Sequence, residues 1–258
     1  MGDLQCAWLL LALCATPRAN HVIRALPPTQ ARAYALEHDS RIWDTLQQLL
    51  CHTPSRGRAR RAQGLSSLPG RLGGLGLRQA ERTSPAAYWA SWADALEVIR
   101  QRRPNEAAAF LADLENAEGA RAPCLREVQT AADLLDREGF AQAGTGARPS
   151  WRELFEGARP PAQEDRRESE PGEWIHGWQF YASSTRETFY REHHLMPSMS
   201  KASRATLRSQ SGPQAAAWLT AVPTSLATTL SPVLFQICLR RRPRLPLLLS
   251  NVGPPWIT

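Results

Sequence analysis

The sequence predicts an all-α protein, an irregular helical bundle with long disordered or Pro- and Gly-rich connectors. Apolar residues recur at helical spacing in several windows, and helix start and stop signals bracket those windows. The 258-residue chain is long enough to bury a core. Its hydrophobic fraction of 43% is interrupted by 20 Pro and 16 Gly. We therefore expect helical blocks joined by loose connectors.

Residues 1–52 are predicted to form a helical segment. They open with an apolar run over 1–15 that has the length of a signal-peptide core. Asp3, in place of a positive side chain, and Pro17-Arg18, at the expected cleavage site, favour a buried core helix instead. The run is shorter than the roughly 20 residues of a membrane span, so membrane insertion is not expected. An intracellular location is favoured, and secretion through residues 1–19 stays the alternative.

Thr29, after the Pro27-Pro28 break, predicts the N-cap of a helix over 30–51. Residues 53–67 are polar and have no apolar period, which predicts a flexible, solvated loop. The loop is rich in arginine and contains Arg56, Arg58, Arg60 and Arg61.

A glycine motif over 68–78, Leu-Pro-Gly-Arg-Leu-Gly-Gly-Leu-Gly-Leu-Arg, opens a predicted segment over 68–138. It matches neither the dinucleotide fingerprint, which needs a preceding strand, nor a P-loop, which needs Gly-Lys-Ser/Thr. Its glycines permit positive φ and close backbone approach. We interpret it as a tight structural crossing between helices, with these structural residues: Leu68, Pro69, Gly73, Gly74 and Gly76.

Three helices are expected after the motif. Ser84 followed by Pro85 predicts an N-cap and a first helical position. Apolar spacing predicts two further helices, over 106–118 and 123–136.

Residues 139–172 are rich in Gly, Pro and charge, which predicts a linker with a disordered stretch over 163–171 and one short helix near Trp151. Residues 173–242 are predicted to be a C-terminal helical segment. It contains an aromatic stripe of Trp174, Trp178 and Tyr181, and Ser200 and Ser231 as N-caps. Residues 243–258 are expected to be an unstructured tail.

The chain is basic, with a formal net charge of +7 and a pI near 9.7. A polyanion partner fits this charge, but Lys201 is the only lysine, and heavy Arg, Ala and Pro use is also typical of GC-rich coding. The five cysteines form no Cys-x-x-Cys pair and are expected to be buried free thiols. Adjacent His193 and His194 point about 100° apart on a helix, so we predict no metal site. No cofactor or small-molecule substrate is indicated.

Several blocks of the sequence resemble non-LTR (LINE-type) retrotransposon reverse transcriptases. The matching part of that family is the thumb and the helical region after the catalytic palm, so residues 1–52 would be thumb-like. The glycine motif is the most specific block. The others are Asp3-Leu4-Gln5, Pro17–Asn20, Ala80 with Pro85–Trp92, Gly172–Trp174 with His176–Gln179, Leu207–Pro213, and Leu239–Arg242 with Leu245–Leu247.

The resemblance implies RNA or RNA–DNA duplex as the partner, contacted by Arg56, Arg58, Arg60, Arg61 and Arg71. The family's polymerase uses palm carboxylates that hold two metal ions, partly from an aromatic-x-Asp-Asp turn. This chain has no Asp-Asp pair, so we expect a non-catalytic remnant or partial sequence. Two alternatives stay open: a secreted or membrane-associated helical protein, and a helical protein-interaction module.

Overall fold

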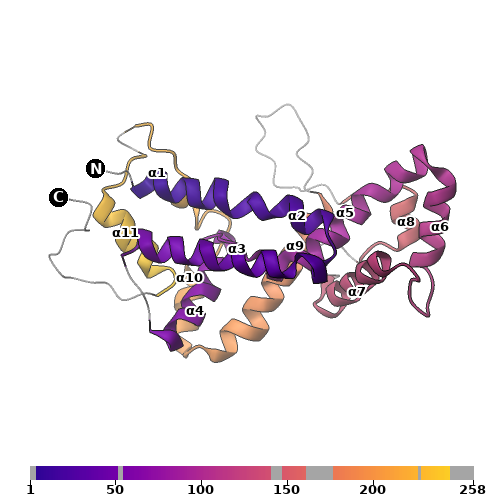
Figure 1. Ribbon diagram of the computed structural model, residues 1–258. Coiled ribbons are helices and arrows are strands. Elements are labelled where there is room, and N and C mark those ends of the chain that lie inside the picture. The colour runs from indigo at the N-terminus through magenta and orange to yellow at the C-terminus, as the bar shows by residue number, and fades with distance from the viewer. Residues whose placement is uncertain (1–3, 52–54, 141–146, 161–176, 226–227, 245–258) are drawn as a thin grey trace. The chain divides into compact units, whose positions relative to one another are not determined.

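A computed structural model describes residues 4–51, 55–140, 147–160, 177–225 and 228–244 (Figure 1). The prediction of an all-α protein is confirmed, since the described residues form helices and turns and contain no strand. The α-helices are α1 (Leu4–Leu9), α2 (Asn20–Ala25), α3 (Pro28–Leu49), α4 (Arg56–Ser67), α5 (Ala80–Arg102), α6 (Pro104–Leu114), α7 (Pro123–Arg137), α8 (Trp151–Phe155), α9 (Trp178–Phe189), α10 (Lys201–Ser209) and α11 (Pro232–Arg241).

Short π- and 3-10-helical turns extend some of these helices or stand between them. They are the π turns η1 (Leu10–Ala15) and η5 (Tyr190–Leu195) and the 3-10 turns η2 (Thr16–Ala19), η3 (Gly70–Leu72), η6 (Met196–Ser198) and η7 (Ala217–Leu219). The predicted stretch 163–171 and most of the predicted tail over 243–258 lie outside the described residues.

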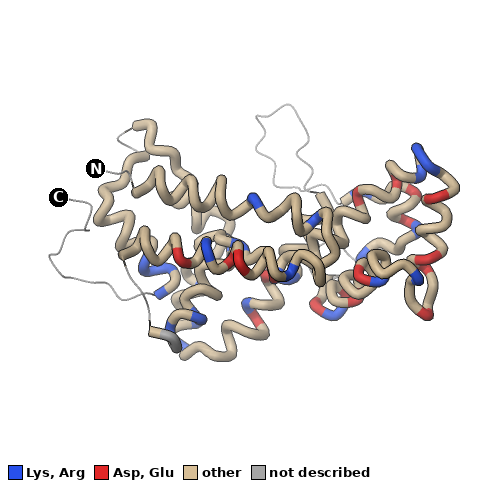
Figure 2. Tube along the Cα trace, in the orientation of Figure 1, with Lys and Arg blue, Asp and Glu red and all other residues tan. Residues whose placement is uncertain are grey.

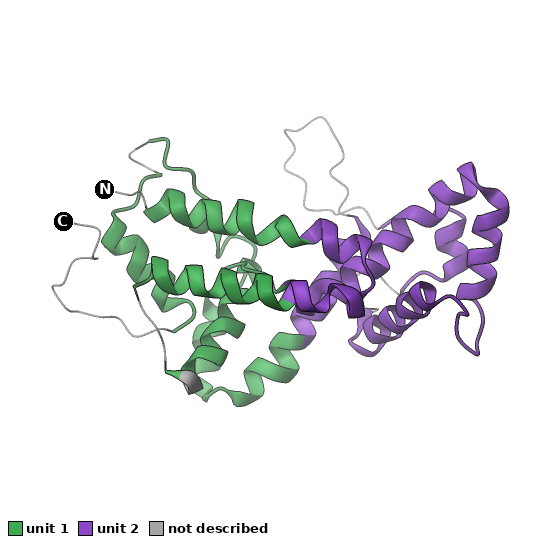
Figure 3. Ribbon diagram, in the orientation of Figure 1, with its two compact units in different colours: residues 1–19, 36–79, 190–258 green, residues 20–35, 80–189 purple. Residues whose placement is uncertain are grey.

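The chain divides into two compact units (Figure 3). Unit 1 comprises residues 1–19, 36–79 and 190–258, and unit 2 comprises residues 20–35 and 80–189. Both units are therefore discontinuous in sequence. Their boundaries fall inside the predicted segments 1–52, 68–138 and 173–242.

Unit 2 is built around α5, which packs against α2, α6, α7, α8 and α9. Trp89 lies at its centre, fully buried, with edge-on ring contacts to Phe140 at 5.5 Å and Trp178 at 6.0 Å between centroids. Two of the predicted stripe aromatics, Trp178 and Tyr181, belong to this core, while Trp174 lies outside the described residues. Edge-to-face packing of this kind adds to the free energy gained from burial.

The start of α5 corrects a sequence prediction. The helix begins at Ala80, so Ser84 is not its N-cap, and Pro85 lies inside the helix. Ser84 is buried, and its hydroxyl makes no hydrogen bond within the described residues. The extra turn is held by tertiary contacts, because Arg82 forms a buried ion pair with Glu187 of α9 at 2.9 Å. A local Ser-Pro start signal cannot anticipate such a long-range pair.

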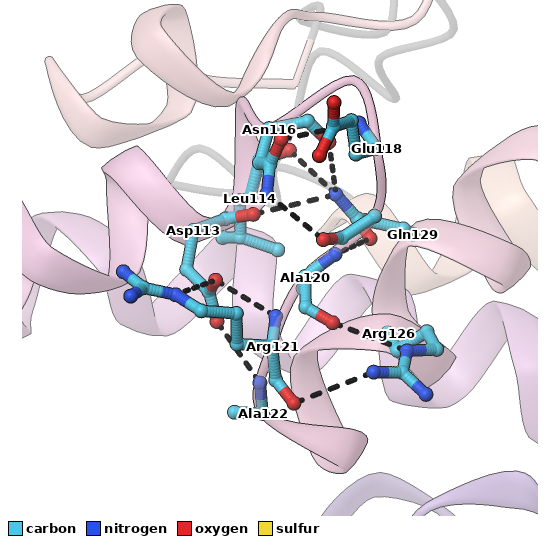
Figure 4. A network of polar contacts seen from close by, with 10 residues as sticks. Asp113, Leu114, Asn116, Glu118, Ala120, Arg121, Ala122, Arg126 and Gln129 are labelled. Atoms are coloured by element: carbon cyan, nitrogen blue, oxygen red, sulfur yellow. Dashed lines mark hydrogen bonds and ion pairs between the residues drawn. The ribbon is translucent and has the colours of Figure 1, made fainter.

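The loop between α6 and α7 is closed by hydrogen bonds from two side chains (Figure 4). The Asp113 carboxylate accepts the backbone N–H groups of Arg121 and Ala122 at 2.8 and 3.1 Å. Gln129 accepts the N–H of Ala120 at 2.7 Å and donates to the carbonyl of Leu114 at 3.0 Å. The two backbone donors at Asp113 lower the pKa of its carboxyl. The network satisfies backbone groups at the end of α6 and the start of α7.

The core of unit 1 joins the two ends of the chain. Trp8 of α1 is fully buried and donates its indole N–H to the carbonyl of Leu219 at 2.8 Å. Gln5 reaches the same region, donating to the carbonyls of Ala221 and Thr228 at 2.8 and 3.0 Å. Buried Phe235 of α11 belongs to the same apolar cluster. The N-terminal apolar run thus supplies core residues in this fold.

The N-terminal helical stretch is longer than the apolar run over residues 1–15 that the sequence shows. Helix and helical turns continue over Leu4–Ala25, 22 residues that are long and apolar enough, by length and composition, to cross a membrane. It is the one such stretch among the described residues. A single stretch of this kind is weak evidence, since buried core helices and signal sequences share these properties. About 33% of it is buried within the fold.

The cysteines differ from expectation. Cys6, Cys14 and Cys124 are exposed, and Cys51 and Cys238 are half-buried. The sequence predicts buried thiols, and none of the five is fully buried. All five are free.

Candidate nucleic-acid interface

Residues 56–67 are helical, so the predicted flexible loop over 53–67 is wrong for most of its length. The second half of α4 packs into unit 1 through Leu65 and the following Leu68, both fully buried. Gly64 allows this close packing, because a Cβ there would lie 2.7 Å from the Tyr190 hydroxyl. Only a few apolar side chains face the core, so no period was visible among the arginines. Tertiary packing rather than local pattern makes this helix.

The predicted contact residues of the 53–67 region lie in the first half of α4. Arg58, Arg60 and Arg61 are exposed, and Arg56 is the first residue of the helix. Arg61 donates to the carbonyl oxygen of Ser198 at 3.2 Å. Within the described residues, none of the three exposed arginines has a carboxylate partner. Arg58, Arg60 and Arg61 therefore face solvent, while the second half of α4 packs into unit 1.

Arg71 is placed differently. It belongs to η3, inside the glycine motif, and is half-buried. Its backbone carbonyl accepts the N–H of Gly212 at 2.9 Å. The structure thus brings four of the five predicted arginines onto one helix and leaves Arg71 in the turn that follows.

The glycine motif forms a buried turn that folds back on the end of α4. The N–H of Gly76 donates to the carbonyl of Leu68 at 2.8 Å, and Ser66 accepts from two N–H groups beyond the turn. Gly73 has φ +89°, in the left-handed region that favours glycine. A Cβ on Gly74 would lie 2.1 Å from the carbonyl oxygen of Leu68. The spacing of the glycines follows from this backbone packing.

Arg242, which is far from the glycine turn in the sequence, hydrogen-bonds to that turn. Its guanidinium is almost fully buried and donates to the carbonyls of Gly74, Ala215 and Gln210. It also lies over the ring of Trp218, 5.7 Å from the centroid. Burial lowers the pKa of this arginine. The sequence showed only a basic helix end here, and it gave no sign that the cation is used internally.

The two units carry opposite net charge. Unit 1 contains 16 Arg and Lys against five Asp and Glu, a formal charge of +11, and unit 2 contains 15 against 19, a charge of −4. The two values sum to the +7 of the whole chain. Figure 2 shows blue segments and no red along α4, whereas both colours occur along α7. The excess positive charge of the protein therefore belongs to one unit.

Other chemistry has little support among the described residues. No group of three or more His, Cys, Asp or Glu side chains there could hold a metal ion. Unit 2 has an open hollow of about 440 Å³. Two of its polar side chains are already engaged, Gln129 with backbone carbonyls and Arg148 with Asp136 at 2.9 Å. The hollow offers no evident catalytic arrangement, because these groups are committed to the fold.

Comparison with protein-family models, with curated proteins and with solved structures finds no match for this chain.

Proposed function

We propose that this chain is a non-catalytic relative of the post-palm region of LINE-type reverse transcriptases, and that it retains binding to the backbone of RNA or RNA–DNA duplex. The observation that carries the binding is the charge of unit 1, +11, combined with exposed α4 arginines that lack carboxylate partners within the described residues. The family assignment is supported by the blocks of sequence resemblance, chiefly the glycine motif over 68–78.

The binding would be electrostatic. Arginine side chains that neutralise phosphates release condensed counterions, and this release makes affinity fall steeply with salt. Arg58, Arg60 and Arg61 are exposed in the first two turns of one helix. Arg58 and Arg61 are three residues apart and so lie on the same side of α4, from which both can reach a phosphate backbone. The proposal includes no catalytic step, because the sequence contains no Asp-Asp pair of the kind that serves the family's polymerase.

The experiment is filter binding of the full chain to an RNA–DNA hybrid over a series of salt concentrations. We expect the logarithm of the affinity to fall linearly with the logarithm of salt concentration. The triple variant R58A/R60A/R61A should bind at least about tenfold more weakly at 100 mM salt, with a shallower slope. Binding that does not depend on salt, or wild-type affinity in this variant, contradicts the proposal.

A second candidate rests on Leu4–Ala25, whose length and composition suit a signal sequence or a membrane anchor. Against cleavage, Trp8 and Gln5 bond to the 219–228 region, so removing residues 1–19 would take away part of the unit 1 core. Sequencing the N-terminus of the mature protein distinguishes the two. An N-terminus at residue 1 or 2 excludes cleavage, and one near residue 20 establishes it.

A further inference from the structure

Helices α10 and α4 contribute to the same apolar cluster of unit 1. Buried Leu207 of α10 shares that cluster with Leu65 and Leu68, and it also contains Met196 and Met199. The bond from Arg61 to the carbonyl of Ser198 ties α4 to the turn that precedes α10. The basic half of α4 therefore lies near the start of α10.

Helix α10 carries cations of its own. Lys201 and Arg208 are exposed and Arg204 is half-buried, and none of them has a carboxylate partner within the described residues. Nearby Arg244 donates to the carbonyl of Ser203 on α10. Burial, and to a smaller degree the charge of Arg61, lowers the pKa of Arg244. Positive charge thus accumulates between the two helices, and no acidic side chain of either helix offsets it.

Both helices also break a local rule of charge placement. Cations are unfavourable near a helix N-terminus, where the backbone N–H groups already carry partial positive charge. Arg56 and Arg58 occupy the first turn of α4, and Lys201 and Arg204 the first turn of α10, with no acidic residue in either turn. Local conflicts of this kind often mark functional positions. An anion bound at either N-terminus would relieve the conflict there.

The same surface lacks two kinds of side chain. Neither α4 nor α10 contains an aromatic residue, so neither supplies a ring on which a base could stack. Among the described residues, the exposed large apolar side chains also lie elsewhere, and the leucines of these helices are buried. Helices that lie on membranes need an apolar face to insert. Charge is what this surface offers to a partner.

We propose that α4 and α10 form one phosphate-binding surface, in which Lys201, Arg204 and Arg208 make a second row of contacts and which recognises backbone charge without reading bases. This inference rests on the proposed function and extends it to α10. We call these residues the α4–α10 surface: Arg58, Arg60, Arg61, Lys201, Arg204 and Arg208.

The test uses the full-length variant K201A/R204A/R208A. Alanine keeps the helix propensity of α10, and the three side chains make no side-chain hydrogen bond within the described residues. The matched control is R102A/R103A/R137A, which removes the same charge from exposed positions of unit 2. Circular dichroism and thermal melts establish that both variants fold.

We expect the α10 variant to bind duplex roughly tenfold more weakly at 100 mM salt, with a slope reduced by about 0.9 for each lost phosphate contact. The control should stay within about twofold of wild type. Poly(A) and poly(U) of equal length should also bind with affinities within about threefold, because stacking does not contribute.

Each outcome bears on a different claim. Absent or salt-independent binding by the wild type overturns the proposed function together with this inference. If the α4 variant loses affinity while the α10 variant binds as wild type, the second row is overturned and the proposed function stands. A strong base preference overturns the claim that charge alone is recognised. Loss of binding to anionic phosphatidylserine vesicles, with nucleic-acid affinity unchanged in the α10 variant, assigns the surface to a membrane and overturns the inference.

Discussion

The two units use arginine in different ways. In unit 2 arginines pair with carboxylates, both inside the fold, as in Arg82–Glu187 at 2.9 Å, and at its surface, as in Arg152–Glu115 at 2.8 Å. In unit 1 the buried arginines bond to carbonyl oxygens instead, with Arg240 on Leu50 and Arg242 on Gly74. Unit 1 has five acidic residues for 16 cations, and two of the five pair with Arg41 and Arg191, so the exposed arginines of α4 have no carboxylate partner within the described residues. Net charge alone therefore does not identify a binding surface, because some of the cations are buried and hydrogen-bond to backbone carbonyls inside the fold.

The largest expected effect concerns the buried ion pair of unit 2. Replacing Glu187, which is fully buried, by Ala leaves Arg82 charged without this partner. We expect a loss of about 3–5 kcal/mol in the free energy of unfolding. Urea titration followed by circular dichroism measures it. E106A, which removes an exposed partner of Arg103, should cost less than about 1 kcal/mol, and similar costs for both variants would contradict the argument.

The glycine turn of unit 1 gives a matched pair of substitutions. Gly74→Ala places a Cβ 2.1 Å from the carbonyl oxygen of Leu68, so we expect a loss of about 3 kcal/mol. In Gly76→Ala the new Cβ meets nothing within 4 Å, and only the φ of +84° is unfavourable. We therefore expect a loss of about 1 kcal/mol in the free energy of unfolding. Thermal melts of the two variants test the difference. Equal melting temperatures would show that packing does not fix the turn.

Removing Arg242 sharpens the contrast between the units. R242A leaves buried carbonyls without a hydrogen-bond donor, but it leaves no opposite charge unpaired in the core. We therefore expect a loss of about 2 kcal/mol in the free energy of unfolding, which is less than for E187A. The exposed neighbour supplies the control, since R241A should change stability by less than about 0.5 kcal/mol. Duplex affinity should be nearly unchanged in folded R242A. A large loss of duplex affinity would contradict the view that Arg242 acts only inside the fold.

The smallest effect depends on pH. The N–H groups of Arg121 and Ala122 lower the pKa of Asp113, so its folded value lies below the unfolded value near 3.9. The stabilisation by Asp113 is then present above pH 4 and is lost as pH falls through the folded pKa. The stability difference between wild type and D113N should shrink between pH 6 and pH 3. A constant difference over that range would contradict the hydrogen-bond argument.

Several elements could be predicted from local pattern. The helices over 106–118 and 123–136 have clear apolar spacing, and the structure contains α6 and α7 there with boundaries shifted by a few residues. Ser200 and Ser231 are the N-caps of α10 and α11, as predicted. Caps and spacing are local, so a single sequence contains them.

Other features depended on distant partners. The sequence predicts a loop in place of α4, because the stability of this helix comes from contacts with the 190–207 region, which no window around residue 60 contains. The start of α5 was misplaced because Arg82 finds its partner 105 residues away. The sequence did not indicate a binding role for the cations of α10. Three basic residues on a short helix are common, and they gain meaning only when the position of α4 is known.

The sequence by itself determined the helical class, the N-caps Ser200 and Ser231, the excess of arginine and the glycine motif, because each is a matter of local propensity or composition. Only the tertiary structure decided which arginines are buried and hydrogen-bonded within the fold and which face solvent, because burial and hydrogen-bond partners are set when distant segments pack. The division of the chain into a basic and an acidic unit has the same origin. Each unit gathers separate stretches of sequence, so its charge cannot be read from any one of them.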